Sequence, residues 1–595
     1  MNISFNPKGF LVEMFNITRL NQKAINQKNI NLKYMQSMKK LFVMFILVFI
    51  GISVFAQTEV EKGMAAITLE AVKGQLEFLA SDWTEGRAVG TKGEYIAADY
   101  IASMLQVSGV KPFGDEVMTT LSRRDMMAGL RPQIGKSYFQ NFSLIQYEPG
   151  EVQTFSVIST AMNSEKAVNF GYKTDFNVRT GVVGQTAKAP VVFVGYGFQN
   201  KEKGYDDLKN INLKGKIALV LAGFPGHKDT ASVAYKKFAP DGRRALFMVE
   251  RNKSELLEKA GALAIIQVIP GSDPMLAWAQ NQIYPVKGAY YEADKPLGSY
   301  YNTAMSLPSD TLTSNIPTFT VTPRLANEII SGTGINFAEF EKNAVDKMLP
   351  ASKELPGKMV SFNTTVKSEI VKARNVLGYI EGVKKDEFIV VGGHYDHVGK
   401  FDGYIWNGAD DNASGTVGVM TIAKAFMATG KKPEKSIIFA AWTGEEKGLF
   451  GSKYFVQEAQ KENMSIALNL NYDMIARDVE RDTLKNMADM SYTKAFAGIE
   501  EITKKNIEDY KINLNLSYRA SEKPSGGSDH APFAEVGIPI FYFMAAMHPD
   551  YHQPSDELSK INWEKMTNII RIGFLNTWEF ANSDEYLQKK ELAKE

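Results

Sequence analysis

The second half of the chain contains four short apolar runs, each followed by residues suited to chemistry. The runs are continuous rather than alternating, which is typical of strands buried on both faces of a parallel sheet. They are Phe388–Val391, Ile437–Trp442, Ile466–Tyr472 and Gly537–Met544. Because ligands of open α/β sheets gather at the carboxyl ends of the strands, these runs should deliver their following residues to one place. The pattern predicts an α/β fold with a mixed, mostly parallel sheet flanked by helices.

Helical periodicity appears at both ends of this pattern. Ile67 to Leu79 and Tyr95 to Leu105 read as amphipathic helices, separated by a glycine-punctuated loop from Ser81 to Thr91. A further helix should run from a Ser414 cap to about Met427. Gly392 and Gly393, after the first apolar run, are expected to let the chain turn and leave the next residues at the strand end.

The middle of the chain has a different sequence pattern, in which short apolar runs alternate with glycines. Val191–Gly195, Ile217–Leu221 and Leu263–Val268 are the predicted strands. The stretch from Ser232 to Lys259 is long and charged and predicts a helical excursion. A separate, β-rich inserted domain is therefore expected here.

The first residues predict targeting rather than fold. Residues 38–56 combine a basic start, an apolar stretch from Leu41 to Val54 and a small-residue end before Gln57, which is typical of a secretory signal peptide. An uncleaved anchor is the alternative. Residues 1–37 show no regular periodicity, and we interpret them as an upstream over-read with Met38 as the true start. The chain is thus expected to be secreted or periplasmic, with no stable membrane insertion after cleavage.

Composition excludes several classes of protein. The chain of 595 residues is 44% hydrophobic and 23% charged, which is ordinary globular composition with room for more than one core. It contains no cysteine, so disulfides and thiolate chemistry are excluded. Without residues 1–56 it holds 61 basic and 66 acidic residues, a net charge near −5. Nothing in this balance favours nucleic-acid binding.

Five residues in sequence order form a candidate metal site. They lie in the stretches GGHYDH, GADDNASG, WTGEEKGLFGS, NYDMIA and DYHQPSDE, and are His394, Asp411, Glu446, Asp473 and His552. Two imidazoles and three carboxylates suit Zn²⁺ or a similar divalent ion. An odd number of carboxylates fits two ions that share one bridge, Asp411. Glu445, next to a candidate ligand, is free to move a proton, as a two-metal hydrolase requires.

Simpler explanations exist for each motif alone. A lone histidine is more often packed than a ligand, but five of the chain's 6 histidines lie in or near these stretches. Ser528-Asp529-His530 is either a supporting element of the site or a polar cap on a helix beginning near Ala531. His548 is expected to stabilise its loop by a hydrogen bond. Arg477 either holds a carboxylate or is an ordinary surface residue, and we favour the latter.

The ordered set resembles metallopeptidase family 28, the aminopeptidases with two co-catalytic zinc ions, over roughly residues 60–585. The resemblance implies the zinc-exopeptidase fold, with His394 and His552 as terminal ligands, Asp411 as the bridge, and Glu446 and Asp473 completing the set. It also implies Glu445 as general base and Asp396 as the carboxylate that orients His394. Gly86-Arg87 resembles a family turn that supports the active site.

One position departs from the family pattern. Some members place a tyrosine three residues before the serine of the Ser528 element, where it helps to polarise the substrate carbonyl; this chain has Ser525 there. Another tyrosine, Tyr551, or zinc itself must then stabilise the oxyanion.

The middle segment resembles a protease-associated (PA) domain, an insertion common in this peptidase family, which shapes the substrate site or is a plain structural insertion. The expected boundaries are 57–160 for the N-terminal part of the peptidase domain, 161–345 for the PA-like domain and 346–595 for the C-terminal part with the metal site.

The expected function is a secreted metallo-exopeptidase with two Zn²⁺, or other divalent ions, which hydrolyses N-terminal residues from peptides through a two-metal-activated water. A carboxypeptidase or a peptidase for a modified dipeptide is the enzymatic alternative. A one-zinc cyclase acting on N-terminal glutamine fits the five-ligand set less well. A noncatalytic, receptor-like binding module is the alternative from another class.

Overall fold

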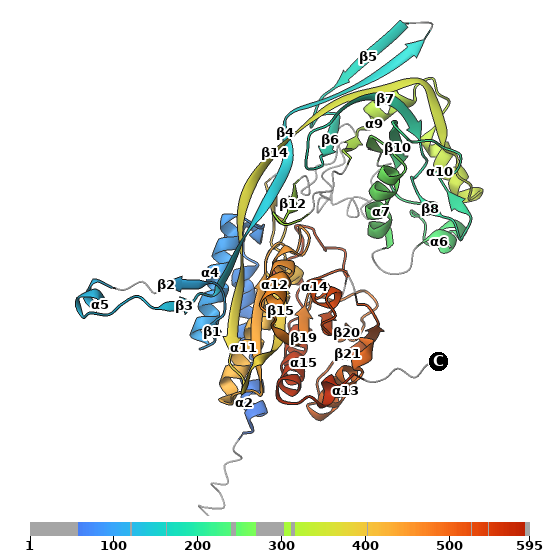
Figure 1. The fold of residues 1–595 in the computed structure, drawn as a ribbon. Helices are drawn as coiled ribbons and strands as arrows, with labels where there is room; N and C mark the ends of the chain where they lie inside the picture. Colours follow the sequence, from blue (N-terminus) through green and yellow to red (C-terminus); the bar gives the residue numbers. More distant parts are fainter. Residues whose placement is uncertain are drawn as a thin grey trace, which may run out of the picture. The chain divides into compact units, whose positions relative to one another are not determined.

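The computed structural model describes residues 57–118, 122–161, 164–239, 245–268, 303–310, 316–401, 403–524, 526–545 and 547–589 (Figure 1). The predicted over-read (1–37), the predicted signal peptide (38–56) and Ser525 lie outside these residues. The chain divides into two units, Met1–Glu61 and Lys62–Glu595, and the features below belong to the second, apart from the first residues of α2 (Glu59–Ala66).

The C-terminal part is built on a mixed sheet in which most neighbouring strands are parallel. In spatial order its strands are β21 (Asn515–Ser521), β20 (Met487–Thr493), β22 (Ile540–Met544), β19 (Ser465–Tyr472), β15 (Lys384–His394), β18 (Lys435–Trp442) and β14 (Lys353–Ile380). β22, β19, β15 and β18 pair in parallel, while β14 is antiparallel to β18 and β20 to β22. The four predicted apolar strands are therefore confirmed as direct neighbours.

Helices cover both faces of this sheet, because side chains from alternate strand positions are buried on each side. One core joins Val390, Ile438 and Trp442 of the strands to Phe455 of α12 (Phe450–Lys461) and Phe533 of α14 (Ala531–Glu535). On the other face, α11 (Gly415–Thr429) and α15 (Trp563–Asn582) pack against the sheet and each other. α13 (Gly498–Asp509) packs against α15.

The N-terminal helices join the same layer as α11. α2 (Glu59–Ala66) precedes α3 (Leu69–Leu79), η1 (Asp82–Arg87) and α4 (Lys92–Val107), which confirms the two predicted helices. Threonine side chains start both longer helices: Thr68 accepts the N–H of Ala71, and Thr91 that of Glu94. α3 contacts α11 and α15, and α4 contacts α11 and β14.

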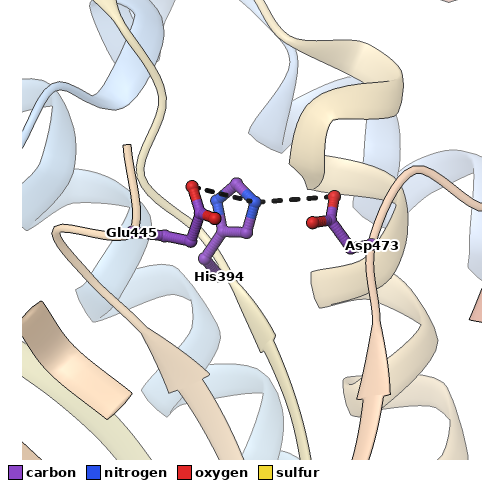
Figure 2. Close-up of side chains that lie close together, drawn as sticks. All are labelled: His394, Glu445 and Asp473. Atoms are coloured by element: carbon purple, nitrogen blue, oxygen red, sulfur yellow. Dashed lines mark ion pairs between the residues drawn. The ribbon is translucent and has the colours of Figure 1, made fainter. Parts of the chain in front are cut away.

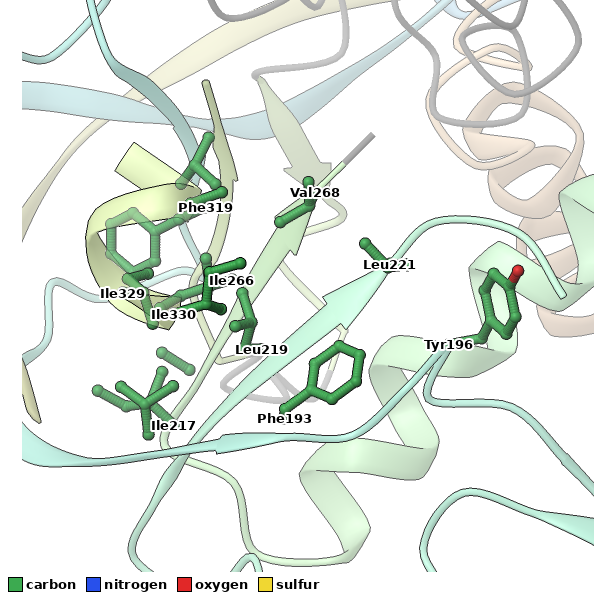
Figure 3. Packing of buried hydrophobic residues seen from close by; sticks show 14 of the residues in the cluster. Phe193, Tyr196, Ile217, Leu219, Leu221, Ile266, Val268, Phe319, Ile329 and Ile330 are labelled. Atoms are coloured by element: carbon green, nitrogen blue, oxygen red, sulfur yellow. The ribbon is translucent and has the colours of Figure 1, made fainter. Parts of the chain in front are cut away.

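In the inserted segment the same sheet continues beyond β14 as a run of parallel strands, with a separate hydrophobic core. β7 (Thr186–Phe193), β10 (Ile217–Leu221), β11 (Ala264–Val268) and β13 (Thr318–Val321) pair in parallel, and β6 (Phe176–Arg179) is antiparallel to β13. Figure 3 shows Phe193, Leu219, Ile266 and Phe319 packed together in this core. The three predicted strands are thus confirmed, while assignment to the PA domain family stays a prediction.

Helices complete the inserted segment. They are α6 (Val233–Phe238), α7 (Ala245–Lys259), α9 (Pro323–Ile330) and α10 (Phe337–Asp346). The predicted helical excursion is thus present in α6 and α7. α7 carries a buried ion pair rather than a purely solvated charge pattern, since Lys253 Nζ lies 2.7 Å from Glu250 Oε1 and both side chains are 3% exposed.

Two long strands connect the C-terminal part of the sheet to the inserted segment. β4 (Phe139–Ala161) and β14 (Lys353–Ile380) form a long antiparallel ladder, and β14 pairs with β18 at one end and with β7 at the other. Their pairing is visible in Figure 1. The short strands β5 (Ser164–Phe170) and β12 (Ala304–Ser306) pair with β4, and β1 (Lys111–Pro112) pairs with β14.

The remaining elements are short excursions. They are β2 (Glu116–Met118), α5 (Arg123–Met127), β3 (Ile134–Lys136), β8 (Gln199–Asn200), β9 (Tyr205–Asp206), β16 (Gly399–Phe401), β17 (Tyr404–Trp406) and η2 to η5 (Ala409–Ser414, Lys494–Phe496, Leu558–Lys560, Glu585–Leu587). Among the helices that the structure describes, none combines the length and apolarity needed to cross a membrane.

Candidate metal centre

The candidate ligands follow the carboxyl ends of four neighbouring strands. His394 ends β15, Glu446 follows β18, Asp473 follows β19 and His552 follows β22. Asp411 lies in η2, the segment ahead of α11. Since these strands are parallel, their carboxyl ends share one edge of the sheet, and the predicted convergence is confirmed.

Gly392 and Gly393 serve close packing, which corrects the predicted turn. β15 continues through both residues to His394. A Cβ on Gly392 would lie 2.4 Å from Trp442 Nε1, and one on Gly393 would lie 2.8 Å from the carbonyl oxygen of Tyr472. The strand therefore needs glycines here because its neighbours leave no room for side chains.

One group of donor atoms surrounds Nε2 of His394. This nitrogen lies 3.4 Å from Asp411 Oδ1, 3.6 Å from Asp473 Oδ1 and 3.9 Å from Glu445 Oε2. Figure 2 shows Glu445 and Asp473 on opposite sides of the imidazole ring. His394, Glu445 and Asp473 offer donor atoms close enough together to hold one ion, and His394, Asp411 and Glu446 form a second such set.

A second group surrounds Nε2 of His552. It lies 3.1 Å from Asp411 Oδ2 and 2.9 Å from Glu446 Oε2. Asp411 therefore presents one carboxylate oxygen to each imidazole, Oδ1 towards His394 and Oδ2 towards His552. This is the arrangement that a bridging carboxylate requires.

The chemistry of the donors fits zinc. All are imidazole nitrogens or carboxylate oxygens, the ligands of catalytic zinc. Oδ1 of Asp473 is buried and accepts no hydrogen bond from the residues that the structure describes, and His394 Nε2 stands 3.6 Å away. A buried carboxylate oxygen without a donor is costly in a protein alone, and a cation would satisfy it.

Electrostatics separate the acids into two kinds. Burial would raise the pKa of Glu446, but the imidazoles of His552 and His397 hold that pKa well below its usual value. Burial raises the pKa of Glu445 well above its usual value, and the neighbouring acids Glu446 and Asp529 add to the effect. Glu446 thus stays ionised, as a ligand must, whereas Glu445 is disposed to hold a proton.

The imidazoles respond in the opposite way. Burial alone would lower the pKa of His394, but Glu445, Asp473 and Asp411 raise it well above the ordinary value. For His552, burial is likewise outweighed by Glu446 and Asp411, which raise its pKa to about 9. Without a bound cation, both rings balance the surrounding carboxylates by holding protons, so protons compete with metal at these nitrogens.

Asp396 lies beside His394 but holds it differently from the expected way. Nδ1 of His394 is 3.1 Å from the backbone oxygen of Asp396 and 3.7 Å from its Oδ1. The Asp396 carboxylate instead accepts the backbone N–H groups of Glu445 and Glu446, at 3.2 and 3.4 Å. Asp396 therefore orients His394 through its main chain and the Glu445–Glu446 loop through its side chain.

His397 is the site residue that sequence reasoning did not assign. Its Nδ1 lies 2.8 Å from Glu446 Oε1 and 3.8 Å from Asp411 Oδ2, and its ring is 1% exposed. The signal in the sequence was the second histidine of GGHYDH, three residues after His394. That spacing alone could not show which carboxylate the ring would meet.

The loop that carries His552 is tied to the loop that carries Asp411. Asp556 accepts the backbone N–H groups of Asp410, at 3.1 Å, and Asp411, at 3.0 Å. His548 Nε2 lies 3.1 Å from Asp410 Oδ2, which confirms the predicted loop-stabilising hydrogen bond. Ser414 caps no backbone N–H of α11, contrary to expectation; its hydroxyl donates to the Asp410 carbonyl instead.

Two buried arginines hold these loops in place through ion pairs and hydrogen bonds. Arg477 is 7% exposed and pairs with Asp550 and Asp556, so its interpretation as an ordinary surface residue is wrong. Arg87 is fully buried and donates to the backbone oxygens of Tyr395, Asn407, Gly408 and Leu79. The predicted supporting role of the Gly86-Arg87 turn is confirmed.

The Ser528-Asp529-His530 element forms hydrogen bonds with residues that lie close in sequence to Glu446 and Asp473. Ser528 Oγ accepts from Asn471 at 2.7 Å, and Asp529 Oδ1 accepts from Ser452 at 2.6 Å. Burial raises the pKa of Asp529 to about 7. The alternative, a polar cap, is not formed: His530, at the start of α14, makes no side-chain capping bond and stacks on Tyr542.

Tyr551 stacks on His552 at 3.8 Å between ring centroids, and its oxyanion role stays a prediction.

A hydrogen bond connects the inserted segment to the loop that follows β18. Lys447, next to Glu446, donates from Nζ to Thr303 Oγ1 at 3.1 Å, just ahead of β12. Burial lowers the pKa of Lys447 to about 8, although Glu446 and Asp396 favour its charged form.

Comparisons with known proteins agree with this geometry. Residues 375–574 match the family described as Peptidase family M28. A glutamate carboxypeptidase 2 homolog of Caenorhabditis elegans is 26% identical over 405 residues, which are 60% of this chain and 48% of that protein. Aminopeptidase Y of Saccharomyces cerevisiae is 26% identical over 238 residues, 38% of this chain and 42% of that protein. The chain thus spans about half the length of the first curated relatives it matches, or less.

A solved structure extends the likeness in fold. The aminopeptidase from Aneurinibacillus sp. strain AM-1 superposes with a TM-score of 0.51 at 18% identity, covering 90% of this chain and 98% of that one. The predicted fold class, a mixed and mostly parallel sheet flanked by helices, is confirmed.

Proposed function

The chain is a member of peptidase family M28 through residues 375–574, and on this premise we propose that it is a zinc-dependent aminopeptidase that removes N-terminal residues from peptides. The observation that carries the proposal is the position of Asp411, with one carboxylate oxygen towards each of two imidazoles. A carboxylate shared in this way is suited to bridge two cations bound side by side.

Two sets of residues would hold the ions. His394 and Asp473 would hold one, His552 and Glu446 the other, and Asp411 would contact both. When bound, zinc supplies a Lewis acid that polarises the scissile carbonyl and lowers the pKa of water. The burial of these side chains keeps bulk water from competing for the ligand atoms.

Glu445 is the proton carrier of the proposed reaction. It takes a proton from the water whose oxygen adds to the scissile carbonyl carbon, and gives that proton to the nitrogen as the C–N bond breaks. The products are a free amino acid and a shortened peptide. The raised pKa of Glu445, caused first by burial, supports this role, because a more basic carboxylate accepts a proton from water more readily. Asp396 holds the Glu445 backbone in place through its carboxylate.

Export is part of the proposal. The basic start and apolar run of residues 38–56 support a secreted or periplasmic location. N-terminal sequencing of the exported protein tests this, with cleavage after Ala56 expected; a mature chain that keeps Leu41–Val54 would contradict it.

A carboxypeptidase acting at the same site is the second candidate. It is favoured by one observation, the likeness over 60% of this chain to a protein named as a glutamate carboxypeptidase 2 homolog. The two activities differ in which end of the peptide must be free. An aminopeptidase needs the ammonium group, and a carboxypeptidase needs the terminal carboxylate.

The test measures metal and substrate end together. The purified protein is analysed for zinc and assayed with leucine-p-nitroanilide, with an N-acetylated peptide bearing a free C-terminus, and with both after chelation. We expect two zinc ions per chain and chelator-sensitive release of p-nitroaniline only. Cleavage of the acetylated peptide alone would establish the carboxypeptidase instead. Failure to bind zinc after replenishment would overturn both and favour a noncatalytic binding module.

A further inference from the structure

His397 reaches the metal centre from the loop that carries His394, yet it points at a different carboxylate. Its backbone N–H donates to the carbonyl of Arg87 at 3.2 Å, and that arginine braces the same loop. A Cβ on Gly408, whose φ is +52°, would lie 2.5 Å from Cδ2 of the His397 ring. The backbone of His397 is thus anchored, and Gly408 lies close against its ring.

The two oxygens of Glu446 are divided between two imidazoles. Oε1 lies 2.8 Å from His397 Nδ1, and Oε2 lies 2.9 Å from His552 Nε2. A contact of this length with an ionised carboxylate requires a proton on His397 Nδ1, because both partners would otherwise be acceptors. His397 therefore occupies Oε1 as a donor and turns Oε2 towards His552 and Asp411.

Asp473, the carboxylate beside His394, has no comparable hydrogen-bond donor among the described residues. Oδ1 of Asp473 accepts no hydrogen bond within the described residues, and the imidazole that faces it, 3.6 Å away, belongs to the candidate ligand His394. Figure 2 shows this half with His394 between Glu445 and Asp473. Hydrogen-bond partners that orient a ligand change metal affinity by about 10- to 100-fold. The two halves of the site are therefore built unequally.

We propose that His397 is a positioning residue that fixes Glu446 by a hydrogen bond and so makes the Asp411–Glu446–His552 half the tighter of the two zinc positions. This inference rests on the proposed two-zinc function and adds an order of binding to it. The half formed by His394, Asp411 and Asp473 fills second and empties first.

The experiment uses zinc itself as the probe. Metal-free wild-type protein, His397→Leu and His397→Asn are titrated with zinc against a chromophoric chelator, and the two stepwise affinities are compared. Leucine fills space but donates no hydrogen bond, whereas the amide nitrogen of asparagine takes the place of Nδ1. His227→Leu is the matched control, because His227 lies in the inserted segment, where its Nδ1 contacts the carbonyl oxygen of Phe224. Near-UV circular dichroism confirms that each variant is folded.

In wild type we expect two distinguishable steps. His397→Leu should weaken the tighter step by about 10- to 100-fold and leave the weaker one unchanged. His397→Asn should restore most of the loss, and His227→Leu should match wild type. Unchanged affinities in His397→Leu, or equal loss at both steps, would overturn the positioning role. Asparagine as impaired as leucine would also overturn it, since that result indicates direct ligation by the imidazole.

The outcome is separable from that of the proposed function. Wild-type protein that binds two zinc ions and cleaves peptides, with unaltered affinities in His397→Leu, removes only the role of His397. Wild-type protein that binds fewer than two zinc ions overturns both the two-zinc function and the order of binding.

Discussion

Nη1 of Arg477 lies 3.4 Å from Oδ1 of Asp556, the buried carboxylate that also accepts the backbone N–H groups of Asp410 and Asp411. The same guanidinium pairs with Asp550 at 2.5 Å through Nη2. One cation thus joins the loop of His552 to the loop of Asp411, and it comes from the chain just past Asp473. Three of the segments that carry candidate ligands meet at Arg477.

Arg477→Met should destabilise the protein and loosen the metal centre. The change leaves Asp556, which is fully buried, without its cation, and removing one partner of a buried pair costs about 3–5 kcal/mol. We expect a lower melting temperature and faster transfer of zinc to a chelator. Arg519→Met is the control, because Arg519 pairs with Asp489 while 55% exposed, and surface pairs contribute about 1 kcal/mol or less. Equal melting temperatures for the two variants would contradict the bracing role.

The strands and most of the candidate ligands were predictable because both have local signatures. Phe388–Val391 and Ile437–Trp442 are apolar at every position, as strands covered on both faces must be, and ligands follow such strands directly. The convergence of His394, Glu446, Asp473 and His552 follows from parallel pairing. These predictions required no knowledge of contacts between residues distant in sequence.

The residues that brace the site were harder to predict because their partners are distant in sequence. Arg87 bonds to the backbone of Tyr395 and Asn407, more than 300 positions away. A charged residue that satisfies buried carbonyls has the same local pattern as one on a solvated surface. Gly392 was misread for a related reason: its need for glycine comes from Trp442 on the adjacent strand, not from its own backbone.

Asp411→Ala should abolish zinc binding at both positions. The substitution removes both oxygens that face His394 Nε2 and His552 Nε2, at 3.4 and 3.1 Å, so neither ion keeps its set of ligands. Elemental analysis after gel filtration should find no bound zinc. Asp386→Ala, which removes an exposed aspartate on β15, should keep the wild-type zinc content. An Asp411→Ala protein that still holds two zinc ions would disprove the bridge.

Glu445→Gln should keep both ions and lose turnover. Glutamine preserves the shape of the side chain but cannot accept and return the proton, so kcat should fall by about 10²- to 10⁴-fold with little change in KM. Zinc content measured on the same sample shows whether the loss is chemical. Glu434→Gln, an exposed change just ahead of β18 (Lys435–Trp442), should retain wild-type kcat. Loss of zinc in Glu445→Gln would make Glu445 a ligand rather than a base.

Glu94 should make stability fall as pH rises towards neutrality. This buried residue of α4 accepts hydrogen bonds from Thr443 Oγ1, at 2.5 Å, and from Tyr395 OH, at 3.1 Å, which flank the Glu445 and His394 motifs. Burial raises its pKa to about 7, from an ordinary 4.5, although these hydrogen bonds oppose the shift. Between about pH 4.5 and 7 the native state therefore keeps a proton that the unfolded chain has released. The stability that this proton provides is complete below that window, declines through it and is lost above pH 7.

Glu94→Gln isolates that contribution, because glutamine is neutral at every pH. Relative to wild type, the variant should gain about 3 kcal/mol between pH 4 and pH 8, as one pKa unit corresponds to about 1.4 kcal/mol. Melting temperatures of the two zinc-free proteins across this range provide the measurement, since the titration of other groups is common to both and cancels in the difference. Glu70→Gln, an exposed change in the first turn of α3 (Leu69–Leu79), should run parallel to wild type. Parallel curves for Glu94→Gln as well would mean that folding does not raise the pKa of Glu94.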